Sequence, residues 1–241
     1  TKSSFQLTAD GLYFRHNGKI FFSVSNPKTE DKDKENNTLG HINSITSIAN
    51  SNKTESSIGK FGVGFKAVFQ YTETPHIYDP NFQFKIERFI IPIQLDKDLD
   101  NREADETIFY FPFNKVGMPA EKAHSDILEK LKKLVFPTLF LSNLQVVEWK
   151  TDSEVGKYTK TSTKPKQSDD ITYKKVLLNQ QIELIQTTEK LEKIEKLYLF
   201  TRSKDENISY SIGFFLDEKN KLKPKKLSAF CFFPTKETTN L

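Results

Sequence analysis

Alternating apolar and polar residues predict the first elements of the chain. Phe5–Thr8 and Leu12–His16 alternate in this way, and Asp10-Gly11 between them is a strong hairpin signal. Asn17-Gly18 then predicts a second turn. The segment Pro27–Asn37 is charged and turn-rich, so we expect a mobile loop there.

Three later segments are predicted to contain helices. Leu39–Ile48 carries isoleucines at helical spacing, and Pro119–Leu134 is amphipathic with a proline at its start. Gly59–Tyr71 opens with glycines and continues with apolar residues, which predicts a glycine-rich turn feeding a helix. The intervening Asn50–Ser57 is polar and built of small residues, as a flexible lid would be.

The remaining apolar segments predict strands, and they dominate the second half of the chain. These segments are Phe82–Leu95 (one long strand or a bent pair), Thr107–Phe113, Leu144–Trp149, Thr172–Leu178, Ile182–Thr188, Glu195–Thr201, Ser209–Leu216 and Leu227–Phe233. We therefore expect an α+β fold over residues 1–150, a two-layer α/β sandwich whose mixed sheet has helices on one face. A β-rich second module is expected over residues 151–241.

Composition narrows the class of protein. The net charge of +4 over 241 residues is too small to argue for nucleic-acid binding, and scattered lysines favour a solvated surface, with weak polyanion contact left open. The single cysteine excludes a disulfide within the chain. No apolar run approaches the roughly 20 residues of a membrane span, so we expect a cytoplasmic protein without membrane contact.

The densest chemical pattern is Ile58–Lys66, in which three glycines precede an apolar helical segment. Glycine lets the backbone approach a ligand closely, and free amides at a helix start suit a phosphate group. Lys66 could add a positive charge. The pattern fits neither the P-loop nor the dinucleotide fingerprint, and a tight turn without a ligand is the alternative.

This stretch resembles the glycine box of the Bergerat-fold (GHKL) ATPases. Phe61–Phe65 is similar to the version in ninety-kilodalton heat-shock chaperones, and Ile48–Lys53 resembles the start of their lid. Phe14–Phe21 and Tyr71–Pro80 are similar to the sacsin-like branch, as is Leu139–Leu144. These motifs span most of the chain in the order of that family.

The resemblance implies an ATP site closed by a lid. Its residues would be His16, Asn17, Gly18, Ser51, Lys53, Gly59, Lys60, Phe61, Gly62, Val63, Gly64, Phe65, Lys66 and Thr107. Thr107 would support the adenine end, although a strand start also favours threonine by propensity alone. His16 occupies the place of an aspartate that accepts from the adenine amine, and a packed strand histidine is the alternative for it.

The family's first helix carries a glutamate that activates water and an asparagine that holds Mg²⁺. That helix would precede Phe5, so we expect the chain to begin after it and to end within the second module. We assign no catalytic residue and no metal ligand here. ATP binding is expected, with slow Mg²⁺-dependent hydrolysis and lid closure in the full-length protein; a module of the same fold without turnover is the alternative.

The resemblance also sets expectations for partners. ATP and an unidentified protein client are expected, and dimerising relatives leave a homodimer open. Several relatives act on DNA, but the modest charge argues against strong nucleic-acid binding by this chain.

Overall fold

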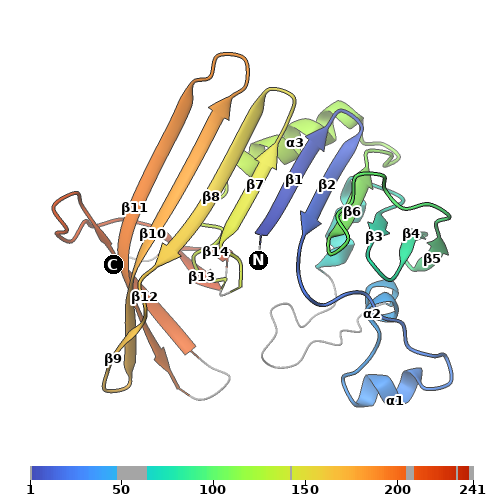
Figure 1. Ribbon diagram of the computed structural model, residues 1–241, viewed down its shortest axis with the longest axis horizontal. Helices are drawn as coiled ribbons and strands as arrows, with labels where there is room; N and C mark the ends of the chain where they lie inside the picture. Colours follow the sequence, from blue (N-terminus) through green and yellow to red (C-terminus); the bar gives the residue numbers. More distant parts are fainter. Residues whose placement is uncertain (1, 48–63, 142, 205–208, 232, 239–241) are drawn as a thin grey trace. The chain divides into compact units, whose positions relative to one another are not determined.

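The chain divides into two compact units. The computed structural model describes residues 2–47, 64–141, 143–204, 209–231 and 233–238 (Figure 1). One unit comprises Ser3–Lys130, and the other comprises Leu131–Leu241 with Thr1–Lys2. We call them the first and second units and describe each by itself. The two units divide between Lys130 and Leu131, so the boundary expected at residue 150 lies inside the second unit, at the end of one of its strands.

The first unit contains six antiparallel strands in the order β1-β2-β6-β3-β4-β5. They are β1 (Lys2–Thr8), β2 (Gly11–His16), β3 (His76–Tyr78), β4 (Gln83–Glu87), β5 (Ile91–Gln94) and β6 (Thr107–Pro112). The predicted first hairpin is confirmed, since Thr8 pairs with Gly11 across a two-residue turn. A Cβ at Gly11 would lie 2.6 Å from the Tyr110 ring, so glycine permits close approach of β6.

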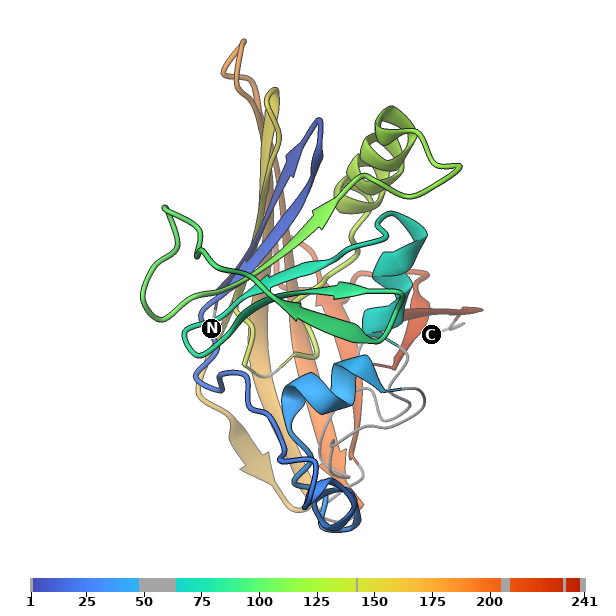
Figure 2. The same ribbon diagram turned by 90° about the vertical axis from the view of Figure 1, so that its right-hand side faces the viewer.

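The helices of this unit are short, with one exception. They are α1 (Glu30–Glu35), α2 (His41–Thr46), the 3₁₀ helix η1 (Phe65–Gln70) and α3 (Ala120–Lys132). Figure 2 shows η1 (teal) and α3 (light green) on the same side of β1 and β2 (blue). The helix predicted over 119–134 is confirmed by α3. The loop predicted over 27–37 contains the short helix α1. Acidic residues in its first turn and lysines in its last turn interact favourably with the helix dipole.

The core of the first unit gathers around β3 and β4. Phe69, Ile77, Phe84 and Ile86 are buried together. Side chains of α2, Ile42 and Ile45, pack against this cluster. The isoleucine spacing that predicted a helix is therefore explained by core contact, although α2 has only six residues.

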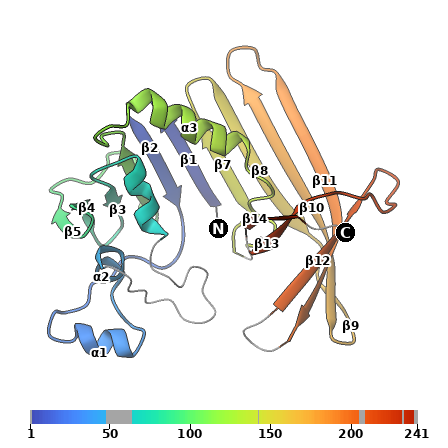
Figure 3. The ribbon, with the colours of Figure 1, turned by 180° about the vertical axis from the view of Figure 1, so that it is seen from behind.

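The second unit is built from long antiparallel strands in the order β12-β11-β10-β8-β7, with β9 paired to β10. They are β7 (Val146–Lys150), β8 (Glu154–Ser162), β9 (Lys166–Ser168), β10 (Ile171–Leu184), β11 (Lys190–Ser203) and β12 (Ser209–Leu216). A separate hairpin joins β13 (Ser228–Cys231) to β14 (Phe233–Thr238), visible in Figure 3. The strand predicted over 172–178 and the start of the one predicted over 182–188 form a single strand, β10, and residues 185–188 lie in the turn that follows it.

One face of β10–β12 carries the core of the second unit. Val176 pairs with Leu197, and both side chains are fully buried. Leu178, Leu199 and Phe215 belong to the same cluster. Since side chains alternate along a strand, Leu177, Tyr198 and their neighbours face the other way.

The predicted two-layer α/β sandwich is wrong, because the structure is mostly β. Strands β10 and β11 have 14 residues each, whereas α3, with 13, is the longest helix among the described residues. Apolar spacing over 39–48 yields six helical residues, and η1 is a 3₁₀ helix of six. The sequence pattern overestimated these helices because short apolar runs with helical spacing do not fix helix length. No described helix has both the length and the apolar character needed to cross a membrane.

Candidate functional site

Two of the predicted site residues meet at the end of β2. His16 is the last residue of β2 and pairs in register with Thr107, the first residue of β6. His16 is half-buried, and its ring lies 6.0 Å from that of Phe109. Antiparallel pairing thus brings together two residues that lie far apart in the sequence.

Behind this pair lies a buried carboxylate that the sequence reasoning missed. The Thr107 hydroxyl donates to Asp79 Oδ2 at 2.7 Å, and Asp79 is 0% exposed. Asp79 Oδ1 accepts from the backbone amides of Phe22 at 3.1 Å and Asn81 at 3.0 Å. Three donors therefore satisfy the carboxylate. Through them, Asp79 connects β6 at Thr107 to the backbone at Phe22 and at Asn81.

Asp79 could have been noticed from its local pattern. It follows β3 directly in Tyr78-Asp79-Pro80-Asn81, and aspartate at such a position bonds backbone amides of the turn. The pattern does not reveal the distant partner Thr107, because that contact depends on the order of strands.

The imidazole of His16 is held in one tautomer. Burial lowers the pKa of His16, while the negative charges of Asp79 and Glu106 oppose the shift. The Gly18 backbone amide donates to His16 Nδ1 at 3.2 Å. Because Nδ1 accepts, the neutral ring carries its proton on Nε2 and offers a hydrogen-bond donor there.

The described end of the glycine box consists of Gly64, Phe65 and Lys66. Gly64 has φ −58° and ψ −46°, and no described atom lies within 4 Å of a Cβ placed there. Phe65 packs edge-on against Phe69 at the start of η1. Lys66 Nζ donates to the carbonyls of Ile45 at 2.7 Å and Phe89 at 2.5 Å, so two of its three protons are already bonded.

The remaining residues of the predicted site divide into two described ones and seven others. Asn17 and Gly18 follow β2 directly. The other predicted residues, Ser51, Lys53, Gly59, Lys60, Phe61, Gly62 and Val63, lie outside the described residues. Over the described ranges, no group of three His, Cys, Asp or Glu side chains could hold a metal ion.

The end of β2 presents one hydrogen-bond donor, Nε2 of His16. Ring nitrogens of a purine are acceptors that such a donor could meet. Thr107 and Asp79 are almost fully buried, so they hold the strand ends in place and do not face a ligand directly.

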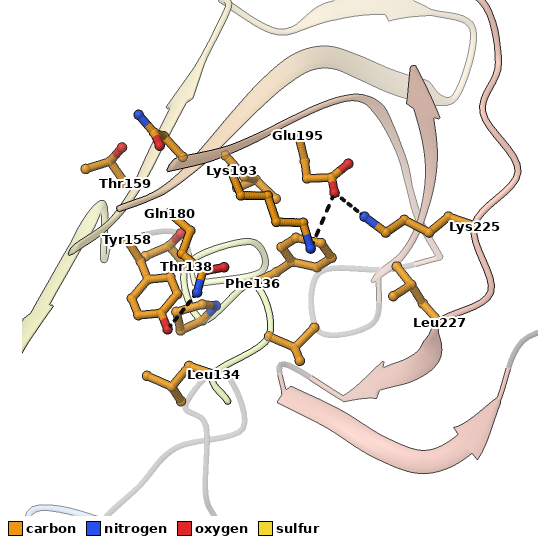
Figure 4. Close-up of a pocket in the computed structure, with 14 residues that line it drawn as sticks. Leu134, Phe136, Thr138, Tyr158, Thr159, Gln180, Lys193, Glu195, Lys225 and Leu227 are labelled. Atoms are coloured by element: carbon orange, nitrogen blue, oxygen red, sulfur yellow. Dashed lines mark hydrogen bonds and ion pairs between the residues drawn. The ribbon is translucent and has the colours of Figure 1, made fainter. Parts of the chain in front are cut away.

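The second unit has a pocket of about 190 Å³ that the sequence reasoning did not predict. Figure 4 shows Glu195 between Lys193 and Lys225 on its wall. Glu195 is buried, and the Lys225 ammonium also lies over the rings of Phe136 and Phe215 at 5.2 and 4.8 Å. The buried ion pair is therefore packed between aromatic rings.

On the opposite side of this pocket, the Tyr158 hydroxyl donates to the Leu131 carbonyl at 3.0 Å and accepts from Gln180 Nε2 at 3.3 Å. Burial raises the pKa of Tyr158. The pocket is smaller than the roughly 300 Å³ at the lower end of small-molecule sites. Tyr158, Gln180, Lys193, Glu195 and Lys225 all have partners, whereas Asn179 Oδ1 is buried without a hydrogen-bond partner among the described residues.

No protein-family model matches the chain, and no curated protein matches it.

Proposed function

We propose that the first unit binds ATP, with the base at the end of β2 and the phosphates at the glycine box. The observation that carries the proposal is the register pairing of His16 with Thr107. The resemblance assigned both residues to the adenine end from the sequence alone. Their adjacency is what such a site requires.

His16 is the residue that meets the base. Its Nε2–H donates to a ring nitrogen of adenine, while Thr107 and Asp79 act as positioning residues. A donor in place of the family's carboxylate loses the direct acceptor for the adenine amine. Guanine also offers acceptors, so we expect weaker discrimination between ATP and GTP than a carboxylate would give.

Turnover is a further part of the proposal. Slow Mg²⁺-dependent hydrolysis needs a general base and metal ligands, which the resemblance assigns to a helix before Phe5. The second candidate is a module that binds nucleotide without turnover, and the histidine at position 16 favours it. Single-turnover assays of the full-length protein with Mg²⁺ separate the two: phosphate release supports the ATPase, and its absence supports the second candidate.

Titration calorimetry with a non-hydrolysable ATP analogue tests whether the first unit binds ATP. The variant Gly64→Ala tests whether the phosphates bind at the glycine box. A methyl group at Gly64 meets no described atom and suits its φ, so stability should change by less than about 0.5 kcal/mol. In the proposed site the methyl group obstructs a phosphate, which should weaken binding about tenfold, or about 1.4 kcal/mol.

Gly117→Ala is the matched control. Gly117 has φ +79°, so alanine there should cost about 1 kcal/mol of stability while leaving ATP affinity unchanged. Absence of wild-type binding at millimolar analogue would contradict the proposal. Equal affinities of the wild type and Gly64→Ala would also contradict the placement of the phosphates.

A further inference from the structure

The sheet of the second unit has an exposed aromatic face opposite its core. The register pairs Tyr173 with Phe200 and Tyr198 with Phe214, which places these four rings on one face of β10–β12. Tyr198 is 37% exposed and Phe214 is 42% exposed. Exposed aromatic rings gathered in this way are typical of a binding surface.

The rings are arranged as a row across the strands. Tyr173 and Phe200 are stacked, with centroids 5.7 Å apart and planes inclined by 22°. Phe200 meets Phe214 edge-on at 5.8 Å. Neighbouring strands thus support each ring and hold it in a fixed orientation.

Lysines surround these rings. A depression of about 420 Å³ is lined by Thr163, Lys166, Tyr173, Lys174, Lys175, Tyr198 and Phe200. None of these described lining residues is acidic. Lys175 Nζ donates to the neutral amide oxygen of Asn220 at 3.0 Å, a contact that leaves its charge uncompensated.

The lysines and rings of this depression indicate which class of partner it fits. A protein partner would favour a different surface, because lysine is depleted from the centres of protein interfaces. Aromatic planes mixed with ammonium groups suit a ligand that alternates flat bases with phosphates.

We propose that this face of β9–β12 binds single-stranded nucleic acid. Bases stack on Tyr198 and on the rings of Tyr173 and Phe200, while Lys166 and Lys175 contact phosphates. A duplex keeps its base faces covered, so it cannot use the rings. Net charge over the whole chain argued against strong binding, but it does not report this local concentration of lysines. The proposal is independent of ATP binding, since all of its residues lie in the second unit.

Fluorescence anisotropy with labelled oligonucleotides of about 12 thymidines or uridines tests the proposal, a length within the site sizes of single-strand binders. Both are expected to bind at low salt, and the tighter one identifies the preferred sugar. With two phosphates contacted, log K should fall with log salt at a slope of about −1.4, at roughly 0.7 per phosphate.

Variants separate stacking from charge. Tyr198→Ala should weaken binding about tenfold through loss of one base stack, and Tyr198→Phe should retain it. Lys175→Gln should weaken binding and reduce the salt slope by about 0.7. The control is Lys193→Gln, which lies on β11 but on the opposite face and should bind as the wild type does. Trp149 fluorescence melts verify that each variant is folded.

Several results would overturn the proposal. One is that neither oligonucleotide binds at about 100 µM protein and low salt. Another is equal affinity for duplex and single strands. A third is wild-type affinity in a folded Tyr198→Ala variant. Loss of self-association in Tyr198→Ala during sedimentation, without any oligonucleotide binding, would assign the face to a second copy of the chain.

Discussion

The two units place polar side chains in opposite environments. In the first unit, Asp79 and Thr107 are buried and bonded to each other and to backbone amides. In the second unit, Lys166 and Lys175 line an open depression beside exposed rings. Buried polar groups with full sets of partners stabilise and position, whereas exposed groups remain accessible to ligands. The buried polar side chains of the first site therefore position strands, whereas the exposed lysines of the second can contact a ligand.

Replacing Asp79 should have the largest effect on stability. Asp79→Ala leaves the amides of Phe22 and Asn81 and the hydroxyl of Thr107 without an acceptor. The expected loss is at least about 3 kcal/mol, or about 1 kcal/mol for each orphaned donor. Hydrogen exchange of the β2 and β6 amides measures it in the first unit.

The control is Asp98→Ala, which removes a partly exposed carboxylate bonded to Arg102. Such surface pairs contribute at most about 1 kcal/mol. If both variants lost the same stability, the distinction between buried and surface polar groups would be contradicted.

Gly156→Ala is expected to have the next largest effect, and it tests apolar packing in the second unit. A Cβ at Gly156 would lie 2.0 Å from the fully buried ring of Trp149. Overpacking of this kind costs about 1–3 kcal/mol. A lower midpoint of Trp149 fluorescence in urea would show it. Gly213→Ala should cost less, because the closest atom to its Cβ is the end of the Leu197 side chain at 3.0 Å.

The smallest expected effect is the pH dependence of the first unit. Burial lowers the pKa of His16 and of His76 below the ordinary value of 6.5. Below that pH the unfolded imidazoles bind protons before the folded ones do, so stability should decrease as the pH falls. Thermal midpoints between about pH 7.5 and pH 5 measure the effect. His16→Gln and His76→Gln should each flatten the profile, and an unchanged profile in both would contradict the assignment.

Sequence patterns predicted local elements better than their extent. The first hairpin, α3 and β12 were predicted because turn residues or clean alternation mark them. The strand β8 was missed because Glu154–Ser162 is mostly polar and has no continuous apolar pattern. It is a strand because it pairs with β7 on one side and β10 on the other. The sandwich prediction failed because helix length depends on tertiary packing.

The candidate sites show the same limit. His16 and Thr107 were named from a resemblance, but their pairing and the hydrogen bond from Thr107 to Asp79 depend on strand order. The aromatic face was missed because the register, and not the local sequence, aligns Tyr173, Tyr198 and Phe214. Residues that act together across strands cannot be assigned until the pairing is known.

Nitrogen-15 NMR of the His16 ring and the Gly18 and Gly64 amides, recorded with and without ATP, tests the central claim most directly. ATP binding at the proposed site should shift the Nε2 resonance of His16 and the Gly64 amide, while the resonances of β10–β12 stay unchanged. Unshifted His16 and Gly64 signals at millimolar ATP would contradict the account.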